Sequence, residues 1–402
     1  MKILLISPHL PAPKTHQAGE RLVFELIKLL SEKHEIHLVV RVHHDDKNPP
    51  NPPLSKGGEG GFSGREGADD DLGPVKAYCR EVYPVFYTRP LRRDFLGLLK
   101  VVLSYFTLCR KANEVAKRGA FDVIHVEWTE TGLFMRKKGV MFIEAHDVLS
   151  KPMERRYRNA RGLQRQLNRV LFAATKMLER HIYAKFRAVF VLSEYDRKYL
   201  LSLSPRLEVA VLNYPFGLPF SGRQFEREEK SLLFLGAMDR GPNVEAVLYF
   251  RNDILPLIRK RVPDVKFIIA GSRPLPALRA LAEKDRNIVL TGFVDDIEAY
   301  YKSSTVFVAP LLTGGGIIVK VLDALASGTP VVTTSIGNEG IGATPGEHLL
   351  LGDSPSDFAE QVVRLLQDKA LRERVGQAGK EFVAEKYSKD SLRKTLEECY
   401  PR

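Results

Sequence analysis

The stretch VFVAPLLTGGGIIVKVLDALASGTPVVTT, residues 306–334, carries the clearest fold signal in this chain of 402 residues. An apolar run ends at Ala309, three glycines follow at 314–316, and apolar residues then recur at helical spacing before the second apolar run PVVTT. A buried strand, a glycine turn, a helix and another buried strand form the parallel β-α-β unit of a doubly wound sheet. The stretch therefore predicts an α/β fold.

The same alternation continues on both sides of this stretch. The runs SLLFLG, VKFIIAG and NIVLTG precede it in the second half of the chain, and each ends in glycine. In the first half, apolar runs typical of buried parallel strands lie at 2–7, 36–42, 123–126, 140–143, 188–192 and 208–212. A helix is expected from about Ala18, between the first two of these runs.

The pattern restarts once, which predicts two Rossmann-like, doubly wound domains. The first spans residues 1–215 and the second 216–385, and the segment 213–230 has the Gly-, Pro- and charge-rich composition of a linker. Residues 386–402 are expected to form a C-terminal helix that packs back toward the N-terminal domain. Residues 47–73 have little to bury, so we expect a disordered insertion there.

The overall composition excludes several classes of protein. With 44% apolar and 27% charged residues the chain reads as a globular protein, and its apolar runs are far shorter than the roughly 18 residues of a spanning helix. The start resembles a first strand more than a secretory leader, so we expect a cytoplasmic protein. The cysteines Cys79, Cys109 and Cys399 are widely spaced, which argues against disulfides and a structural zinc site.

The glycine turn of the opening stretch has the features of a diphosphate site. Glycines allow backbone N–H groups to approach a ligand, a helix N-terminus favours anions, and Lys320 adds a positive charge in the first turn. Asp323 lies one turn deeper on the same side and can accept hydrogen bonds from ribose hydroxyls. The alternative is a tight strand-to-helix turn with a Lys–Asp pair of purely structural role.

A second glycine-ended strand places Gly236 and Arg240 in a loop before a helix that starts near Asn243. Ligands of open α/β sheets bind beyond the carboxyl ends of strands, so both loops can reach one ligand. No G-x-G-x-x-G motif follows a strand and no G-x-x-x-x-G-K-[ST] motif exists, which argues against dinucleotide-binding enzymes and P-loop NTPases.

These segments resemble the donor half of family 4 (group 1) glycosyltransferases of the GT-B fold. The resemblance is close over about 231–388, through GAMDRGPNVEAVLYF, PLIRKRVPDVKFIIAGSRP, NIVLTGFVDD and the opening stretch, and looser in the first half through EAHDV and VFVLSEYD. It implies two Rossmann-like domains with a nucleotide-sugar bound in the cleft between them, transfer with retention, and no bound metal or other cofactor.

The resemblance also implies roles for individual residues. Arg240 and Lys320 would neutralise the donor diphosphate, Asp323 would hold the ribose, and His146 would approach the sugar from the acceptor domain. The remaining donor-binding positions are glycines, namely Gly236, Gly314, Gly315 and Gly316, together with Gly19 in the acceptor-side loop that faces the diphosphate. Asp147 and Glu127 are weaker candidates for contacts with acceptor hydroxyls.

The chain departs from the family pattern at two positions. The family's pair of glutamates, with seven residues between them, is Gly315 and Asp323 here, so the first carboxylate is absent and the second is shorter. Activity can be lower or absent for this reason. No pair of carboxylates can be placed in one loop, which argues against a glycosidase.

The sequence thus predicts a retaining, metal-independent hexosyltransferase-type glycosyltransferase that acts on a lipid-linked or polysaccharide acceptor in cell-envelope biosynthesis. A nucleotide-sugar epimerase of the same fold and a catalytically weak nucleotide-sugar-binding subunit are the alternatives. An epimerase would turn over its donor without any acceptor.

The net charge of +12 comes from the first half of the chain. Residues 1–215 contain 36 Lys and Arg against 24 Asp and Glu, whereas 216–402 contain 25 of each. The stretch 151–187 predicts one long amphipathic helix whose apolar face packs on the sheet and whose cationic stripe faces anionic lipid on the inner side of the membrane, or simply water. The stripe consists of Arg158, Arg165, Arg169, Lys176, Arg180 and Arg187. Nucleic acid is not expected, because aromatic residues are not interleaved with the charges.

Overall fold

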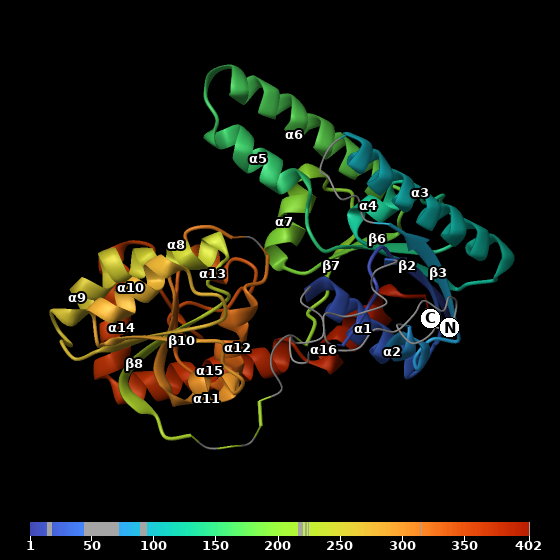
Figure 1. The fold of residues 1–402 in the computed structure, drawn as a ribbon. Coiled ribbons are helices and arrows are strands. Elements are labelled where there is room, and N and C mark those ends of the chain that lie inside the picture. Colours follow the sequence, from blue (N-terminus) through green and yellow to red (C-terminus); the bar gives the residue numbers. More distant parts are fainter. Residues whose placement is uncertain are drawn as a thin grey trace, which may run out of the picture. The chain divides into compact units, whose positions relative to one another are not determined.

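The computed structural model of the chain contains two compact units, which Figure 1 shows as a ribbon. The first comprises Met1–Val191, Arg197–Leu212 and Arg393–Arg402, and the second comprises Leu192–Asp196 and Asn213–Leu392. The structure describes residues 1–401 except 14–17, 44–71, 89–94, 216–219, 222, 224 and 315. The predicted insertion at 47–73 therefore lies almost entirely outside the described residues.

The first unit contains a parallel sheet in the order β3-β2-β1-β4-β5-β6-β7. Its strands are β1 (Lys2–Ser7), β2 (Glu35–His43), β3 (Glu81–Tyr87), β4 (Val123–Glu127), β5 (Met141–Ala145), β6 (Ala188–Val191) and β7 (Val209–Val211). Every residue of β4 and β5 is buried, so both faces of the sheet are covered, as expected for parallel strands joined by helices.

The helices of this unit connect its strands in sequence. They are α1 (Ala18–Ser31), α2 (Gly73–Lys76), α3 (Phe95–Arg118), α4 (Thr129–Gly132), α5 (Ser150–Asn159) and α6 (Gly162–Tyr183), followed by α7 (Glu194–Leu203), which crosses the boundary of the two units. The strand β3 was not predicted. Its Pro84 cannot donate a ladder hydrogen bond and its residues are mostly half-exposed, and both features suit the edge of a sheet.

The second unit contains a parallel sheet in the order β10-β9-β8-β11-β12-β13. Its strands are β8 (Glu228–Leu235), β9 (Lys266–Ala270), β10 (Ile288–Gly292), β11 (Ser304–Ala309), β12 (Val331–Thr333) and β13 (Leu350–Leu351). Its helices are α8 (Gly241–Tyr249), α9 (Leu255–Arg259), α10 (Pro276–Lys284), α11 (Ile297–Ser303), α12 (Val319–Ser327), α13 (Ser335–Asn338), α14 (Pro355–Gln367) and α15 (Lys369–Lys386). The predicted strands of both halves are present, and the α/β class is confirmed.

One predicted helix of the second unit is interrupted. The expected helix over 243–260 consists of α8, a π-helical turn at Phe250–Ile254 and α9. Pro256 explains the change of pitch, because its ring has no N–H to donate and clashes with the carbonyl four residues earlier.

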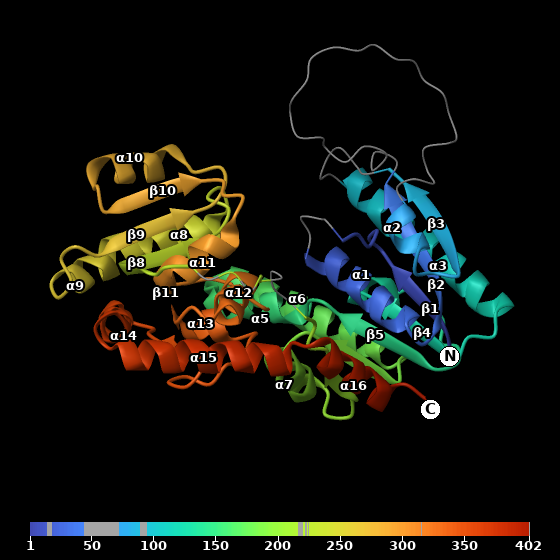
Figure 2. The same cartoon turned by 90° about the horizontal axis from the view of Figure 1, so that it is seen from below.

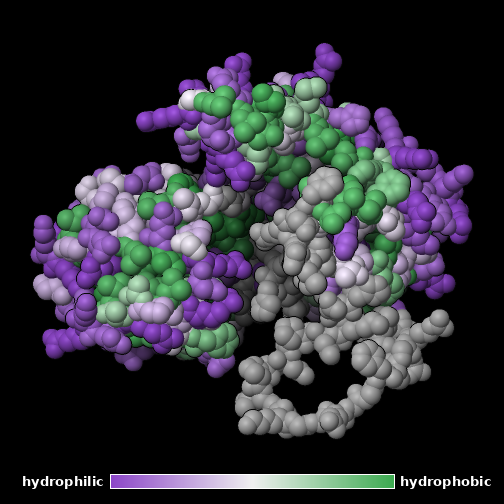
Figure 3. Space-filling model, turned by 45° about the horizontal axis from the view of Figure 1, so that its top comes forward, coloured by the Kyte–Doolittle hydropathy of each residue, from purple (hydrophilic) through white to green (hydrophobic). Residues whose placement is uncertain are grey.

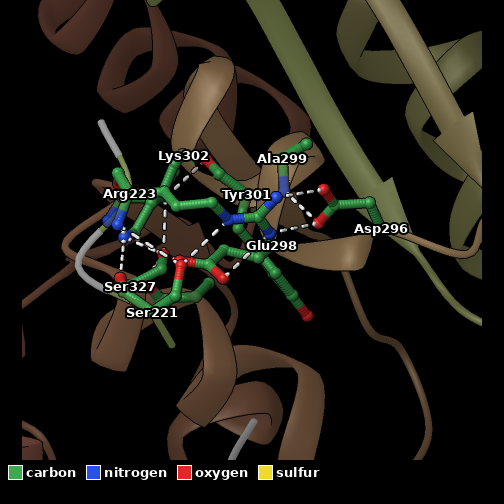
Figure 4. A network of polar contacts seen from close by, with 10 residues as sticks. Ser221, Arg223, Asp296, Glu298, Ala299, Tyr301, Lys302 and Ser327 are labelled. Atoms are coloured by element: carbon green, nitrogen blue, oxygen red, sulfur yellow. Dashed lines mark hydrogen bonds and ion pairs between the residues drawn. The ribbon is translucent and has the colours of Figure 1, made fainter. Parts of the chain in front are cut away.

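The start of the second unit is attached to α11 by a polar network (Figure 4). Arg223 binds both carboxylate oxygens of Asp296 at 3.0 and 3.1 Å and also reaches Glu298 at 3.3 Å. Lys302 pairs with Glu298 at 2.8 Å and donates to the backbone oxygens of Ser221 and Arg223. These contacts, above all the Lys302 ammonium, lower the pKa of Glu298 to about 2. The network holds the chain in register where it enters β8.

The C-terminal helix α16 (Lys389–Cys399) places its later residues in the first unit, as Figure 2 shows. Arg393 pairs with Glu32 at 2.5 Å, and Glu397 pairs with Lys33 at 2.8 Å. Beyond the helix, the fully buried Tyr400 hydroxyl lies 2.5 Å from Nδ1 of His125 in β4. The end of the chain thus completes the core of the first unit.

The expectation of one long helix over 151–187 is wrong in two respects. The segment forms two helices, α5 and α6, because the chain turns at Ala160–Gly162, where Gly162 has a φ of +54°. The apolar face of α6 also does not pack on the sheet: Leu163 is 87% exposed and Val170 is 65% exposed. The two helices instead pack against each other.

Candidate functional site

Each sheet has one point at which the order of the strands reverses. In the second unit the chain runs outward from β8 to β9 and β10 and then returns to β11 on the other side of β8. In the first unit the same reversal separates β1 and β4. Loops at the carboxyl ends of such strands diverge and leave room for a ligand. The candidate site residues lie on these loops.

The loops after β8 and β9 approach each other so closely that two glycines are required. A Cβ atom on Gly236 would lie 2.6 Å from Nζ of Lys320. A Cβ atom on Gly271 would lie 1.8 Å from the carbonyl oxygen of Gly236, and the φ of Gly271 is +151°. Any larger residue would displace this backbone or the lysine.

The side chain of Lys320 lies beside these glycines, and its partners are uncharged. Its ammonium donates to Oδ1 of Asn243 at 2.6 Å and lies 4.4 Å from the centre of the Phe234 ring. Among the described residues, no carboxylate lies within ion-pair distance of it. Burial, and then the charge of Arg240, lower the pKa of Lys320 to about 7. A bound anion would restore the charged form.

Arg240 lies in the loop between β8 and α8, and Asp323 lies in α12, as the sequence motifs predict. Arg240 is exposed and directly precedes α8, where its charge is felt by Lys320. Asp323 is buried within α12 and lies close enough to Tyr301 to contribute, after burial, to the raised pKa of that phenol. The Tyr301 hydroxyl donates to the backbone oxygen of Lys320 at 3.1 Å, so α12 is held from the side of α11.

The glycines before α12 are in part described. Gly316 has a φ of +70°, which a glycine adopts without strain, and a Cβ on Gly340 would lie only 2.2 Å from the Gly316 oxygen. Gly314 is half-buried. Gly315 lies outside the described residues.

His146 follows β5 in the first unit and lies on a pair of buried carboxylates. Its Nε2 is 2.8 Å from Oε2 of Glu127 and 3.6 Å from Oε1 of Glu144, and its side chain is 5% exposed. Glu127 and Glu144 are direct partners in the β4–β5 register and are fully buried. No single loop contains this pair, which is why the sequence did not reveal two carboxylates in one place.

The charges of this cluster shift its protonation. Burial acts to lower the pKa of His146, but the carboxylates of Glu144 and Glu127 outweigh burial and raise it. Burial and then Glu144 raise the pKa of Glu127. The cluster therefore keeps its protons to higher pH than isolated side chains would.

Trp128 covers this cluster and was not singled out from the sequence. Its ring stacks on His146 with centroids 3.9 Å apart, and His9, which follows β1, meets it edge-on at 4.7 Å. A Cβ on Gly19 would lie 2.6 Å from the indole ring, so the glycine at the start of α1 makes room for the tryptophan. Trp128 has a φ of +63°, a conformation that costs free energy in a non-glycine residue and is concentrated at functional sites. Its position directly after β4, as the sole Trp of the chain, was the available signal.

His125 extends the cluster toward the interior. Its Nε2 lies 3.4 Å from Oε1 of Glu127 and 3.7 Å from Oε2 of Glu144. Ligand atoms of these three residues lie within 4.8 Å of one another, so among the described residues this group is able to hold a metal ion. The weaker candidate Asp147 is exposed and lies next to His146 in sequence.

The second unit also carries a recognisable family signature. Residues 229–368 match the family model described as Glycosyl transferases group 1. The second unit is therefore similar to the group 1 glycosyltransferases.

Curated relatives match about two fifths of the chain. A phosphatidyl-myo-inositol mannosyltransferase of Mycobacterium leprae is 32% identical over 164 residues, which are 40% of this chain and 43% of that protein. An uncharacterized 44.6 kDa protein in the cps region of Klebsiella pneumoniae is 27% identical over 176 residues, 42% of this chain and 45% of that protein. The matches thus span less than half of the length of these relatives.

Solved structures of low sequence identity match the chain over nearly its whole length. Sucrose-phosphate synthase from Thermosynechococcus elongatus has a TM-score of 0.66 at 17% identity and covers 99% of this chain and 98% of its own. HepE from Anabaena, in complex with UDP, has a TM-score of 0.61 at 12% identity, with 99% of both chains covered. The two-domain GT-B fold is confirmed.

Proposed function

We propose that this protein transfers a sugar from a nucleotide-sugar donor to an acceptor hydroxyl. The observation that carries the proposal is Lys320, a part-buried ammonium with a lowered pKa that faces Gly236 and has Asn243 as its hydrogen-bond acceptor. A site that buries a cation without a counter-ion is suited to bind an anion. The similarity of the second unit to group 1 glycosyltransferases and its glycine loops support a diphosphate as the anion.

The donor would lie along the carboxyl ends of β8 and β11. Arg240 and Lys320 would neutralise the diphosphate, Gly236, Gly314 and Gly316 would allow the backbone to approach it, and Asp323 would accept hydrogen bonds from the ribose. Gly315 would leave the sugar without the carboxylate usual in the family. His146, Trp128 and Gly19 would serve the acceptor side.

We further propose that transfer retains the anomeric configuration. The acceptor oxygen would attack from the face that the diphosphate leaves, and a diphosphate oxygen would take the acceptor proton. Catalysis would then rest on positioning and on cations that stabilise the leaving group, without a metal. NMR of the product's anomeric proton tests retention. A rate unchanged by EDTA tests metal independence, and loss of activity with recovery on adding a divalent ion would instead point to His125, Glu127 and Glu144.

A thermal-shift panel of UDP-, GDP- and ADP-sugars tests the donor assignment. A donor at about 100 times its dissociation constant stabilises the folded protein by roughly 2.7 kcal/mol, whereas the matching free sugar should not. Absence of a shift with every nucleotide-sugar would contradict the proposal.

The buried His146 cluster is the observation that favours an epimerase, because epimerisation needs acid and base groups near the sugar. Incubation of the donor alone separates the two activities. Conversion of the donor without an acceptor would support the epimerase, and transfer only upon addition of an acceptor supports the transferase. Binding without either reaction would indicate a donor-binding subunit.

The acceptor is proposed to be a lipid-linked sugar or glycan at the anionic inner face of a membrane. The support is the basic character of α5 and α6, where Arg165, Arg169 and Arg180 are exposed and Glu179 is buried. No helix among the described residues is long and apolar enough to cross a bilayer. Attachment would therefore be peripheral.

A further inference from the structure

Two helices of the first unit present large apolar side chains to solvent. On α6 these are Leu163, Leu167, Val170, Leu171, Met177 and Leu178, which are 40 to 87% exposed. On α3 they are Leu96, Leu98, Leu99, Val102, Leu103 and Phe106, which are 42 to 65% exposed. Figure 3 shows the corresponding hydrophobic surface over these helices, interrupted by hydrophilic side chains.

The exposed residues form one stripe on each helix. Their spacing of three and four residues places them on one side at about 100° per residue. The other side of α3 is packed: Leu108, Cys109 and Ala112 are buried, and the Ser104 hydroxyl accepts from Arg41 at 2.7 Å. The stripes are therefore the sides of these helices that no described part of the chain covers.

Both helices also touch the short helix α4, so both belong to the same side of the first unit's sheet. Figure 1 draws them along one edge of that unit. One flat partner can accordingly meet both stripes.

The charges beside the stripes define the chemistry of that partner. The buried side of α6 carries Asn168 and Glu179. The exposed remainder of α6 has two parts, the apolar stripe and a row of exposed arginines formed by Arg165, Arg169 and Arg180. The only acidic residues of 151–187 are occupied: Glu154 pairs with Arg158, and Glu179 accepts from the backbone N–H of Leu149. On α3 no acidic residue precedes Glu114, while Lys100 and Arg110 are exposed. Apart from the exposed Glu130 of α4, whose charge reaches Tyr105 of α3 and Tyr183 of α6, the surface is apolar and cationic.

We propose that α3 and α6 anchor the protein in the interface of an anionic bilayer by inserting their apolar stripes among the acyl chains. Monomeric proteins rarely expose contiguous apolar patches of this kind without a partner. Arginine stems can extend along the edge of an inserted stripe while their guanidinium groups reach phosphates. The inference deepens the membrane part of the proposed function and does not depend on the transfer reaction.

Vesicle sedimentation tests the proposal with three variants of the full chain. One replaces Leu163, Leu167 and Val170 with Gln, one replaces Leu98, Val102 and Leu103 with Gln, and one replaces Arg165, Arg169 and Arg180 with Gln. The matched control replaces Leu275 and Val289 with Gln, which are exposed apolar residues of the second unit. Vesicles consist of phosphatidylcholine alone or with roughly a third phosphatidylglycerol.

The wild type is expected to bind the anionic vesicles and to keep part of this binding at about 1 M salt, where charge attraction is screened. Each apolar variant should bind at least about tenfold more weakly at low salt, because three inserted side chains are lost. The arginine variant should lose the preference for anionic lipid, and the control should match the wild type. Insertion would be overturned if the wild type lost all vesicle binding at high salt and both apolar variants bound as strongly as the wild type at low salt.

A depth measurement gives an independent readout. Leu99→Trp and Val170→Trp place a fluorophore in each stripe, and Leu275→Trp is the control. Lipids brominated in the acyl chains should quench the two stripe probes and not the control, above the constant background of Trp128. Stripe probes that are not quenched would overturn the proposal. Dimerisation in solution that the apolar variants abolish would also overturn it, because the stripes would then pack against a second copy of the chain.

Failure of this inference is separable from failure of the proposed function. The apolar variants should keep the wild-type thermal shift with a nucleotide-sugar, because their residues are exposed and lie outside the donor loops. A normal donor shift with no vesicle binding contradicts only the anchor. Vesicle binding without any donor shift contradicts only the transferase.

Discussion

The two sheets reverse their strand order at equivalent places but line them with different groups. Beyond β8 and β11 the second unit offers glycine backbone, Arg240 and the part-buried Lys320. Beyond β1 and β4 the first unit offers aromatic rings and buried carboxylates around His146. The same topology thus places a part-buried cation at one edge and a buried cluster of histidine and carboxylate side chains at the other.

The largest expected effect lies on the cationic edge. Lys320→Ala should lower kcat/KM for transfer by roughly 10²-fold or more, because a charge that stabilises a leaving diphosphate is typically worth about 3 kcal/mol. Steady-state kinetics with the identified donor measures this loss. Lys260→Ala, at an exposed lysine after α9, is the matched control. Equal rates for both variants would remove Lys320 from the diphosphate site.

A smaller effect is expected deeper in the same edge. Asp323→Ala should weaken donor binding about tenfold, because a charged hydrogen-bond acceptor for the ribose is lost. Asp323→Glu should preserve or improve binding, since it restores the longer carboxylate of the family. Isothermal titration with a nucleotide-sugar measures both, and three equal affinities would show that Asp323 has only a structural role.

For the His146 cluster of the first unit, the expected effect is a change in pKa and not in donor binding. Glu127→Gln keeps the shape of the side chain but removes a charge that raises the pKa of His146, so the imidazole should titrate at lower pH. NMR of the histidine ring protons follows this shift. Donor affinity should remain within about twofold of the wild type, because Glu127 belongs to the first unit and the donor loops belong to the second. A donor-affinity loss as large as that of Asp323→Ala would break the division between the two edges.

The smallest expected effect concerns the folding stability that the protein loses by burying Lys320. Its pKa is about 7 in the folded state and 10.5 ordinarily, so between these values the unfolded chain binds more protons and wild-type stability rises with pH. Lys320→Met removes this cost, which is largest at and below pH 7. Because the side chain is part-buried, we expect about 1 kcal/mol near pH 6, or a rise in Tm of about 2–4 °C, and less near pH 9. A Tm that is lower at both pH values would show that Lys320 stabilises the fold.

The two edges also differ in how far they could be predicted. The loops of the second unit were predicted because glycine, lysine and helix start follow one another within the stretch 306–334. The cluster in the first unit was not, apart from His146 and the weak candidate Glu127. It depends on the register that pairs Glu127 with Glu144 and on the packing of Trp128, and neither is local in sequence.

The surface helices show a second limit of sequence patterns. Periodicity indicated that α6 has an apolar side, but not what that side faces, and the expectation that it packs on the sheet was wrong. Likewise β3 was missed because Pro84 and half-exposed residues hide an edge strand. Buried central strands such as β1 and β11 were predicted because both of their faces must be apolar.

The last residues of the first unit have a consequence for synthesis in the cell. Arg393–Arg402 belong to that unit, and Tyr400 reaches His125 in its core, yet the ribosome makes them about 180 residues after Leu212. At translation rates of about 5–20 residues per second, the first unit waits roughly 10 to 35 s for its final segment. During that interval His125, beside the carboxylates of Glu127 and Glu144, lacks its tyrosine, and the second unit can fold first. A nascent chain stalled before Arg393 is therefore expected to be a target for chaperones, although most of its residues are already made.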